Sequence, residues 1–126
     1  MDWKEYKAAS KARGSLALEV FVIVSTPTGS PEFVKQNLPD HLSYQAEQEA
    51  AGVLMFAGPL SDETGDIMNG GGMILYKTES LEIAKRIAEQ DPMHLSGARA
   101  FTIRRWLINE GSLQLDIKLS AQSISL

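Results

Sequence analysis

Residues 73–92, MILYKTESLEIAKRIAEQDP, contain a complete strand-to-helix unit with a start and a stop signal. The first six residues, 73–78, are mostly apolar or β-branched, which is typical of a buried strand. Ser80 is a preferred N-cap residue. The ten residues after it place four apolar side chains on one helical face: Leu81, Ala84, Ile87 and Ala88. Asp91 then ends the helix, because a residue that precedes a proline, here Pro92, is displaced from the helical region.

A second strand and helix lie nearer the N-terminus. Residues 16–25, LALEVFVIVS, indicate a buried strand, and residues 31–51 favour a helix that Gly52 ends. Pro39 lies inside this helical stretch. We therefore expect a short opening turn, followed by a main helix that begins near Asp40.

Two more strands, at 53–58 and 98–108, complete the order β-α-β-β-α-β. This order is the split βαβ, or ferredoxin-like, arrangement of the α+β class, with a four-stranded antiparallel sheet and both helices on one face. Residues 2–13 predict an additional N-terminal helix, and the alternating C-terminal tail favours one extra strand.

The length of 126 residues favours one domain. We expect that domain to have three parts: an N-terminal helical arm at 1–14, a ferredoxin-like core at 15–108 and a C-terminal strand or tail at 109–126.

The fourth strand carries apolar side chains on both faces. Phe101 and Ile103 lie on one side, and Trp106 and Ile108 lie on the other. Helices cover only one face of the sheet, so a second subunit is the economical cover for the other face. We expect a homodimer, or a higher oligomer built from it.

Composition excludes several functional classes. The net charge is −4 and the basic residues are scattered, which argues against nucleic acid as a partner. There are no cysteines, so disulfides, thiolate nucleophiles and cysteine-bound zinc are excluded. The longest apolar run, LALEVFVIV, is far shorter than the ~20 residues of a membrane helix, and the N-terminus lacks the apolar region of a secretory signal. We expect a cytoplasmic protein without a membrane partner.

Several segments in one order resemble a known family. They are DHLSYQAEQEAAG, then AGPLSD, then SLEIA at the start of the second helix and DP at its end, spread over residues 39–106. Together they are similar to the YciI-like family of small dimeric α+β-barrel proteins. The resemblance implies a ferredoxin-like fold, a dimer, and an active site of one histidine and one aspartate, here His41 and Asp91.

One relative in that family is a dehydrochlorinase of a chlorinated hydroxyhydroquinone, so the resemblance implies acid–base elimination on a small ring. The chain departs from the simplest family pattern in its N-terminal arm, in its second histidine and in its tail. These departures leave the substrate open.

His41 and Asp91 have the chemistry of an acid–base pair. A neutral imidazole suits proton transfer near pH 7. An aspartate on one ring nitrogen fixes the tautomer and makes the other nitrogen a stronger base. The alternative is that His41 is a surface residue and that Asp91 caps a helix or turn.

The remaining candidates are substrate contacts. His94 could assist His41 or bind an anion, or be a loop histidine; Ser61 in GPLSD could bind a substrate oxygen, or serve only the turn. Arg104 and Arg105 face opposite sides of a strand, and one could bind a substrate carboxylate, or both could form only salt bridges. The glycines of NGGG, 69–72, favour a flexible turn or lid over a phosphate loop. Neither a metal nor another cofactor is expected, because no closely spaced histidine pair is present.

The leading hypothesis is a lyase- or isomerase-like enzyme that acts on a small ring or enolisable acid, with His41 as base and Asp91 as its orienting partner. The alternative is a non-catalytic protein that binds a small ligand or serves as a dimeric accessory to another protein. A shared fold does not decide between them.

Overall fold

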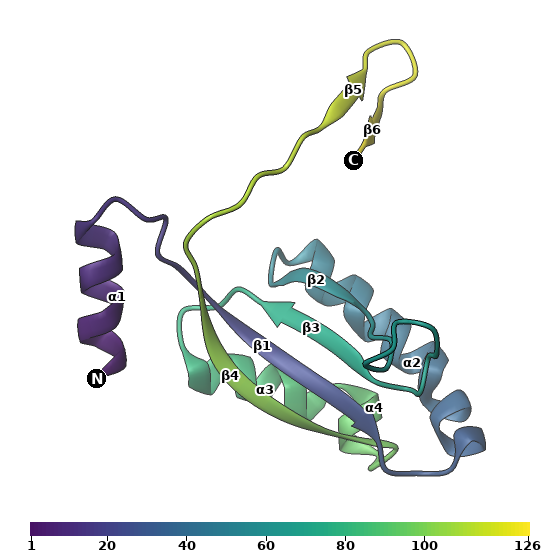
Figure 1. Ribbon diagram of the computed structural model, residues 1–126. Helices are drawn as coiled ribbons and strands as arrows, with labels where there is room; N and C mark the ends of the chain where they lie inside the picture. Colours follow the sequence, from purple (N-terminus) through teal and green to yellow (C-terminus); the bar gives the residue numbers. More distant parts are fainter. The chain divides into compact units, whose positions relative to one another are not determined.

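The computed structural model describes residues 1–126, with four helices and six strands. The chain divides into two compact units. One consists of Met1–Leu18 and Leu107–Leu126, and the other of Glu19–Trp106. Nearly all of the main sheet and three of the helices belong to the second unit; Figure 1 labels each helix and strand.

The main sheet has four antiparallel strands in the order β2-β3-β1-β4. Their bounds are β1 Leu18–Pro27, β2 Leu54–Pro59, β3 Gly72–Tyr76 and β4 Arg99–Ile108. In the register of β1 on β3, Ile23 lies opposite Ile74. The order and direction of the strands confirm the predicted α+β, ferredoxin-like fold.

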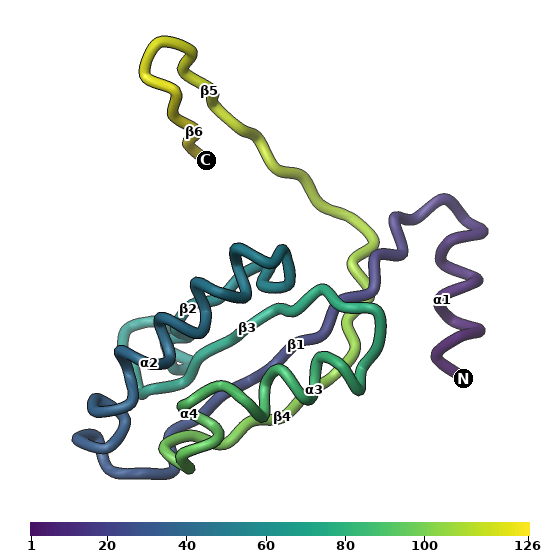
Figure 2. Tube along the Cα trace, turned by 180° about the vertical axis from the view of Figure 1, so that it is seen from behind, coloured from purple at the N-terminus to yellow at the C-terminus, as the bar shows by residue number.

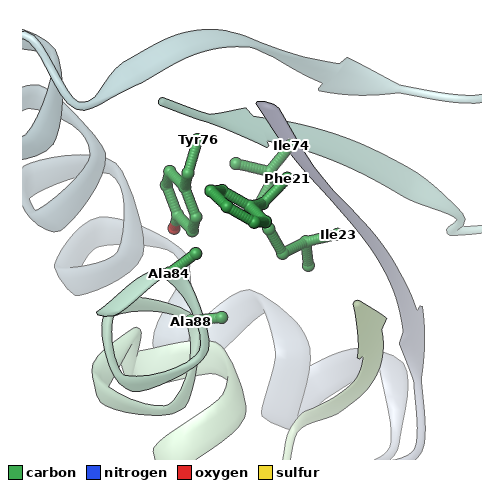
Figure 3. Close-up of a cluster of buried hydrophobic side chains, with 6 residues drawn as sticks. All are labelled: Phe21, Ile23, Ile74, Tyr76, Ala84 and Ala88. Carbon is green, nitrogen blue, oxygen red and sulfur yellow. The ribbon is translucent and has the colours of Figure 1, made fainter. Parts of the chain in front are cut away.

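Helices α2 (Pro31–Ala50), α3 (Leu81–Gln90) and α4 (Pro92–Leu95) lie on one face of this sheet, as Figures 1 and 2 show from opposite sides. The core lies between this face and α3. Figure 3 shows that four sheet residues meet two small helix residues there: Phe21, Ile23, Ile74, Tyr76, Ala84 and Ala88. The two alanines are fully buried, and their small side chains allow α3 to approach the sheet closely.

The first long helix differs from its prediction. Residues 31–50 form one continuous helix with Pro39 inside it, so the expected break near Asp40 was wrong. The start signal is Ser30, whose hydroxyl oxygen accepts the Phe33 N–H, followed by Pro31 in the first turn. Pro39 removes one internal hydrogen bond, but packing against the rest of the domain keeps the helix intact.

The unit that contains both chain ends has its own short elements. Helix α1 (Trp3–Ala12) is capped by Asp2. The tail forms a hairpin of β5 (Asp116–Lys118) and β6 (Ser123–Ser125), where one strand was expected. The alternating pattern predicts extended chain but not the turn that divides it, in which Gln122 has a φ of 51°. No helix of the chain combines the length and apolar character that a membrane span requires.

Candidate active site

Asp91 joins α3 to α4. Its backbone is extended, with φ −58° and ψ 127°, as expected of a residue before a proline. Its Oδ1 accepts a hydrogen bond from the Met93 N–H at 2.9 Å and so caps α4, while Pro92 occupies the first turn. The Asp91 side chain is completely buried. A carboxylate in this position requires further polar partners.

His41, on α2, is such a partner. Its Nδ1 lies 2.8 Å from Oδ1 and 2.9 Å from Oδ2 of Asp91. An ionised carboxylate only accepts hydrogen bonds, so Nδ1 is the donor and a neutral ring has its lone pair on Nε2. Nε2 makes no hydrogen bond within the protein, and the side chain is 16% exposed. The ring is therefore held at one nitrogen and open at the other.

His94, on α4, lies in a different hydrogen-bond network. Its Nδ1 donates to the Ala88 carbonyl at 2.7 Å, and its Nε2 lies 2.8 Å from the Ser25 hydroxyl. Because a carbonyl oxygen cannot donate, Nδ1 carries the hydrogen. In a neutral ring, Nε2 therefore accepts a hydrogen bond from the Ser25 hydroxyl. Burial lowers the pKa of His94 below its ordinary value, although the Ala88 carbonyl and Asp91 oppose this shift. Both ring nitrogens are occupied, so His94 has no free nitrogen for proton transfer.

Arg99, at the start of β4, continues the network. Its Nε donates to the Ser25 hydroxyl oxygen at 2.8 Å, and its Nη2 donates to the Ser25 carbonyl at 2.7 Å and to the Gly70 carbonyl. Burial lowers the pKa of this guanidinium, and the charge of Asp91 opposes the shift. No carboxylate forms an ion pair with Arg99.

A pocket of about 490 Å³ is lined by His41 from the first group and by Ser25 and Arg99 from the second, whereas Asp91 and His94 do not line it. Its polar side chains are Ser25, His41, Gln45 and Arg99. The rest of the wall is mostly apolar: Val34, Leu38, Leu42, Ala57, Pro59, Met68, Met73, Ile74 and Met93, with Gly58 and Gly70–Gly72. This size and composition are typical of a small-molecule site.

The other residues singled out in the sequence lie elsewhere. Ser61 is exposed, and its hydroxyl donates to the Asp62 carbonyl at 2.9 Å. Arg104 and Arg105 are exposed on β4, and Arg105 lies 3.9 Å from a Glu19 oxygen. None of the three lines the pocket. The glycines of NGGG do line it, and Gly70 holds Arg99.

Sequence reasoning missed Ser25, Gln45 and Arg99. Gln45 follows His41 by four residues, so helical spacing already placed both on one face of α2. Ser25 and Arg99 are 74 residues apart in the sequence, and no local pattern connects them. Histidine and acidic side chains do not gather anywhere in the chain into a group of three that could hold a metal ion.

The fold and the pocket place the chain in a class of small α+β proteins that have a histidine–aspartate pair at a mostly apolar pocket. Residues 19–107 match the YCII-related domain, and the chain therefore belongs to the YCII-related, or YciI-like, family. This result confirms the family resemblance found in the sequence.

Two relatives illustrate the similarity. The chain is 29% identical to the uncharacterized protein YjpA of Bacillus subtilis (strain 168) over 79 residues, which are 63% of this chain and 86% of YjpA. It is also similar to the 5-chloro-2-hydroxyhydroquinone dehydrochlorinase TftG of Burkholderia phenoliruptrix AC1100, solved in complex with 2,5-dihydroxybenzoquinone. That match has a TM-score of 0.52 and 18% identity, and covers 69% of this chain and 92% of TftG. At this identity the similarity shows a shared fold.

Proposed function

We propose that this chain is an acid–base enzyme that takes a proton from a small ring compound or enolisable acid, in lyase-, isomerase- or dehydrochlorinase-like chemistry. The observation that carries the proposal is the hydrogen bond of 2.8 Å between His41 Nδ1 and the buried carboxylate of Asp91, in a histidine that lines a pocket of about 490 Å³. The resemblance in fold to a dehydrochlorinase supports the same type of chemistry.

In the proposed reaction, His41 is the base and Asp91 orients it. A proton on a carbon next to a carbonyl group moves to Nε2, and the electron pair of the broken C–H bond forms the C=C bond of an enolate. If chloride occupies the adjacent carbon, that pair instead forms the alkene, and chloride leaves with its bonding electrons. The ionised Asp91 stabilises the imidazolium that His41 becomes. The apolar wall keeps water from competing for the proton.

A direct test uses 5-chloro-2-hydroxyhydroquinone, the compound named for the structural relative. Its chlorine lies on an aromatic carbon, so the reacting form is the keto tautomer, which has a hydrogen on that carbon. In this form a ring hydroxyl proton moves to His41 Nε2, the electrons of the O–H bond form a C=O bond, and the displaced ring π electrons form a new C=C bond as chloride leaves. Release of chloride and exchange of substrate protons with D₂O are measured for wild type, His41→Ala and Asp91→Asn. We expect loss of about 10²- to 10⁴-fold in rate for His41→Ala, since general acid–base catalysis contributes that much.

The alternative is a binding or accessory protein without turnover. It predicts that a panel of small ring acids binds wild-type protein but undergoes neither chloride release nor proton exchange. Equal rates in wild type and folded His41→Ala would also contradict the enzymatic proposal.

A further inference from the structure

We propose that Arg99 binds the anionic oxygen of the ligand, and that the pocket selects a small planar monoanion, either a carboxylate or an ionised ring hydroxyl. The reacting end of such a ligand, near His41, rests on the proposed function. The binding of the anion to Arg99 does not depend on that function.

The first observation is a charge without a counter-ion. Arg99 is the only permanently charged residue in the pocket wall, and it has no carboxylate partner. The nearby carboxylate of Asp91 is directed at His41 and the Met93 N–H. A cation in a mostly apolar wall attracts an anion strongly, because little water screens its charge.

The second observation concerns the hydrogens of the guanidinium group. Arginine has five N–H donors. Nε donates to the Ser25 hydroxyl oxygen, and the two hydrogens of Nη2 serve the carbonyls of Ser25 and Gly70. Nη1 has no partner within the protein, so both of its hydrogens remain for a ligand. The fork of Nε and Nη2 is already used, and an incoming oxyanion is therefore bound at Nη1.

The third observation is that Arg99 is held rigidly. The Ser25 hydroxyl accepts from Arg99 Nε and donates to His94 Nε2, and His94 Nδ1 donates to the Ala88 carbonyl. Gly70 contributes the remaining carbonyl with a φ of 94°, and a Cβ at this position would lie 2.6 Å from Pro27 Cγ. Such a preorganised cation loses little conformational freedom when an anion binds.

The size of the pocket and the chemistry of its wall determine the size and the charge of the ligand. A volume of about 490 Å³ suits a small ring, and three methionines in the wall adapt their shape to it: Met68, Met73 and Met93. Because the wall carries one positive charge, a single negative charge is matched, whereas a second would be left unpaired.

The experiment compares ligands of similar shape and different charge. Benzoate, 4-nitrophenolate and neutral benzamide are titrated into wild-type protein, and the Arg99 Nε–H and Gly70–Gly72 amide resonances are followed by NMR. We expect benzoate, 4-nitrophenolate or both to shift these resonances. Neutral benzamide should bind at least about tenfold more weakly than the anion that binds. Comparison of the two anions distinguishes a carboxylate from an ionised hydroxyl.

Arg99→Gln should abolish the preference for the anion, whereas Arg86→Gln, which removes the same charge from the exposed side of α3, should retain it. The wild-type comparison needs no variant and remains decisive even if Arg99→Gln fails to fold. The proposal is overturned if neither anion binds more tightly than benzamide.

His41→Ala separates the two proposals. It should lose turnover while it retains the preference for benzoate over benzamide, because Arg99 is still present. Anion binding by the wild-type protein without turnover would contradict the proposed function and leave the role of Arg99 supported.

Discussion

At the residue scale, one carboxylate connects the backbone to the proposed base. Asp91 caps α4 through the Met93 N–H and, with the same side chain, orients His41. The proline that follows Asp91 sets its backbone, and that backbone places the carboxylate at the junction of two helices. The position of the proposed base is therefore coupled to a local stop signal in the chain.

Asp91→Asn tests this coupling, because asparagine can still cap α4 but lacks the charge. We expect ¹⁵N NMR of wild-type protein to show His41 with its proton on Nδ1, and the variant to show a mixture of both tautomers. Turnover should fall by a factor of up to about 10⁴, as a wrongly oriented tautomer predicts. An unchanged tautomer in the variant would show that Asp91 does not orient the ring.

His94 makes a separate prediction about pH. Burial lowers its folded-state pKa below the ordinary 6.5, so the unfolded chain takes up a proton at a pH where the folded chain does not. Neutral His94 therefore contributes stability in full above about pH 6.5, and this contribution is lost as the pH falls toward the folded-state pKa.

The measurement is urea unfolding of wild type and His94→Gln between pH 5 and 8. The wild type should lose more stability than the variant as the pH falls over this range. Parallel curves for wild type and His94→Gln would contradict the prediction. His41→Gln is the control, and its curve should run parallel to that of the wild type because His94 is still present.

At the scale of elements, a tyrosine joins the two long helices. Tyr44 on α2 donates its hydroxyl proton to the Ile87 carbonyl on α3 at 2.7 Å. This carbonyl lies in the last turn of α3, where carbonyl groups lack helical partners. Burial, more than nearby Asp91 and Glu47, raises the pKa of Tyr44, so its proton remains available for this bond.

Tyr44→Phe should lower the free energy of unfolding by about 1 kcal/mol, because the Ile87 carbonyl loses its donor. Tyr76→Phe is the matched control. The Tyr76 hydroxyl is buried without a hydrogen-bond partner, so its removal should be neutral or stabilising. Urea unfolding of both variants tests the pair, and equal destabilisation by the two would contradict it.

At the scale of the whole molecule, exposed apolar side chains lie on the face of the sheet opposite α2, α3 and α4. Strand alternation places three exposed apolar side chains there: Val24, Phe56 and Trp106 at 36%, 48% and 43% exposure. Exposed apolar groups on one face are typical of a subunit interface. We therefore expect two copies of the chain to pair through this face.

Trp106→Glu should convert the dimer to a monomer of 13.8 kDa, since a charge at such an interface would be buried without a partner. Light scattering after size-exclusion chromatography measures the mass. Leu95→Glu, at an exposed apolar residue of α4, is the control and should leave the mass unchanged. A monomeric wild type would contradict the prediction.

Local patterns in the chain were sufficient for the order of elements in the core, for the bounds of α3, and for the position of the Asp91-Pro92 junction at its end. Start and stop signals act over a few residues, so they can be recognised without a structure. Pro39 shows the limit of such rules, because packing along α2 outweighed the tendency of a proline to break a helix.

Long-range packing alone made Ser25, Gly70 and Arg99 neighbours. Arg99 lies 74 residues from Ser25 and 29 residues from Gly70, and each is unremarkable in its own segment. Strand order places β1 beside β4, and the return of the chain through the NGGG loop adds the last carbonyl. Hydrogen-bond partners of this kind depend on spatial register between distant segments, which local periodicity does not encode.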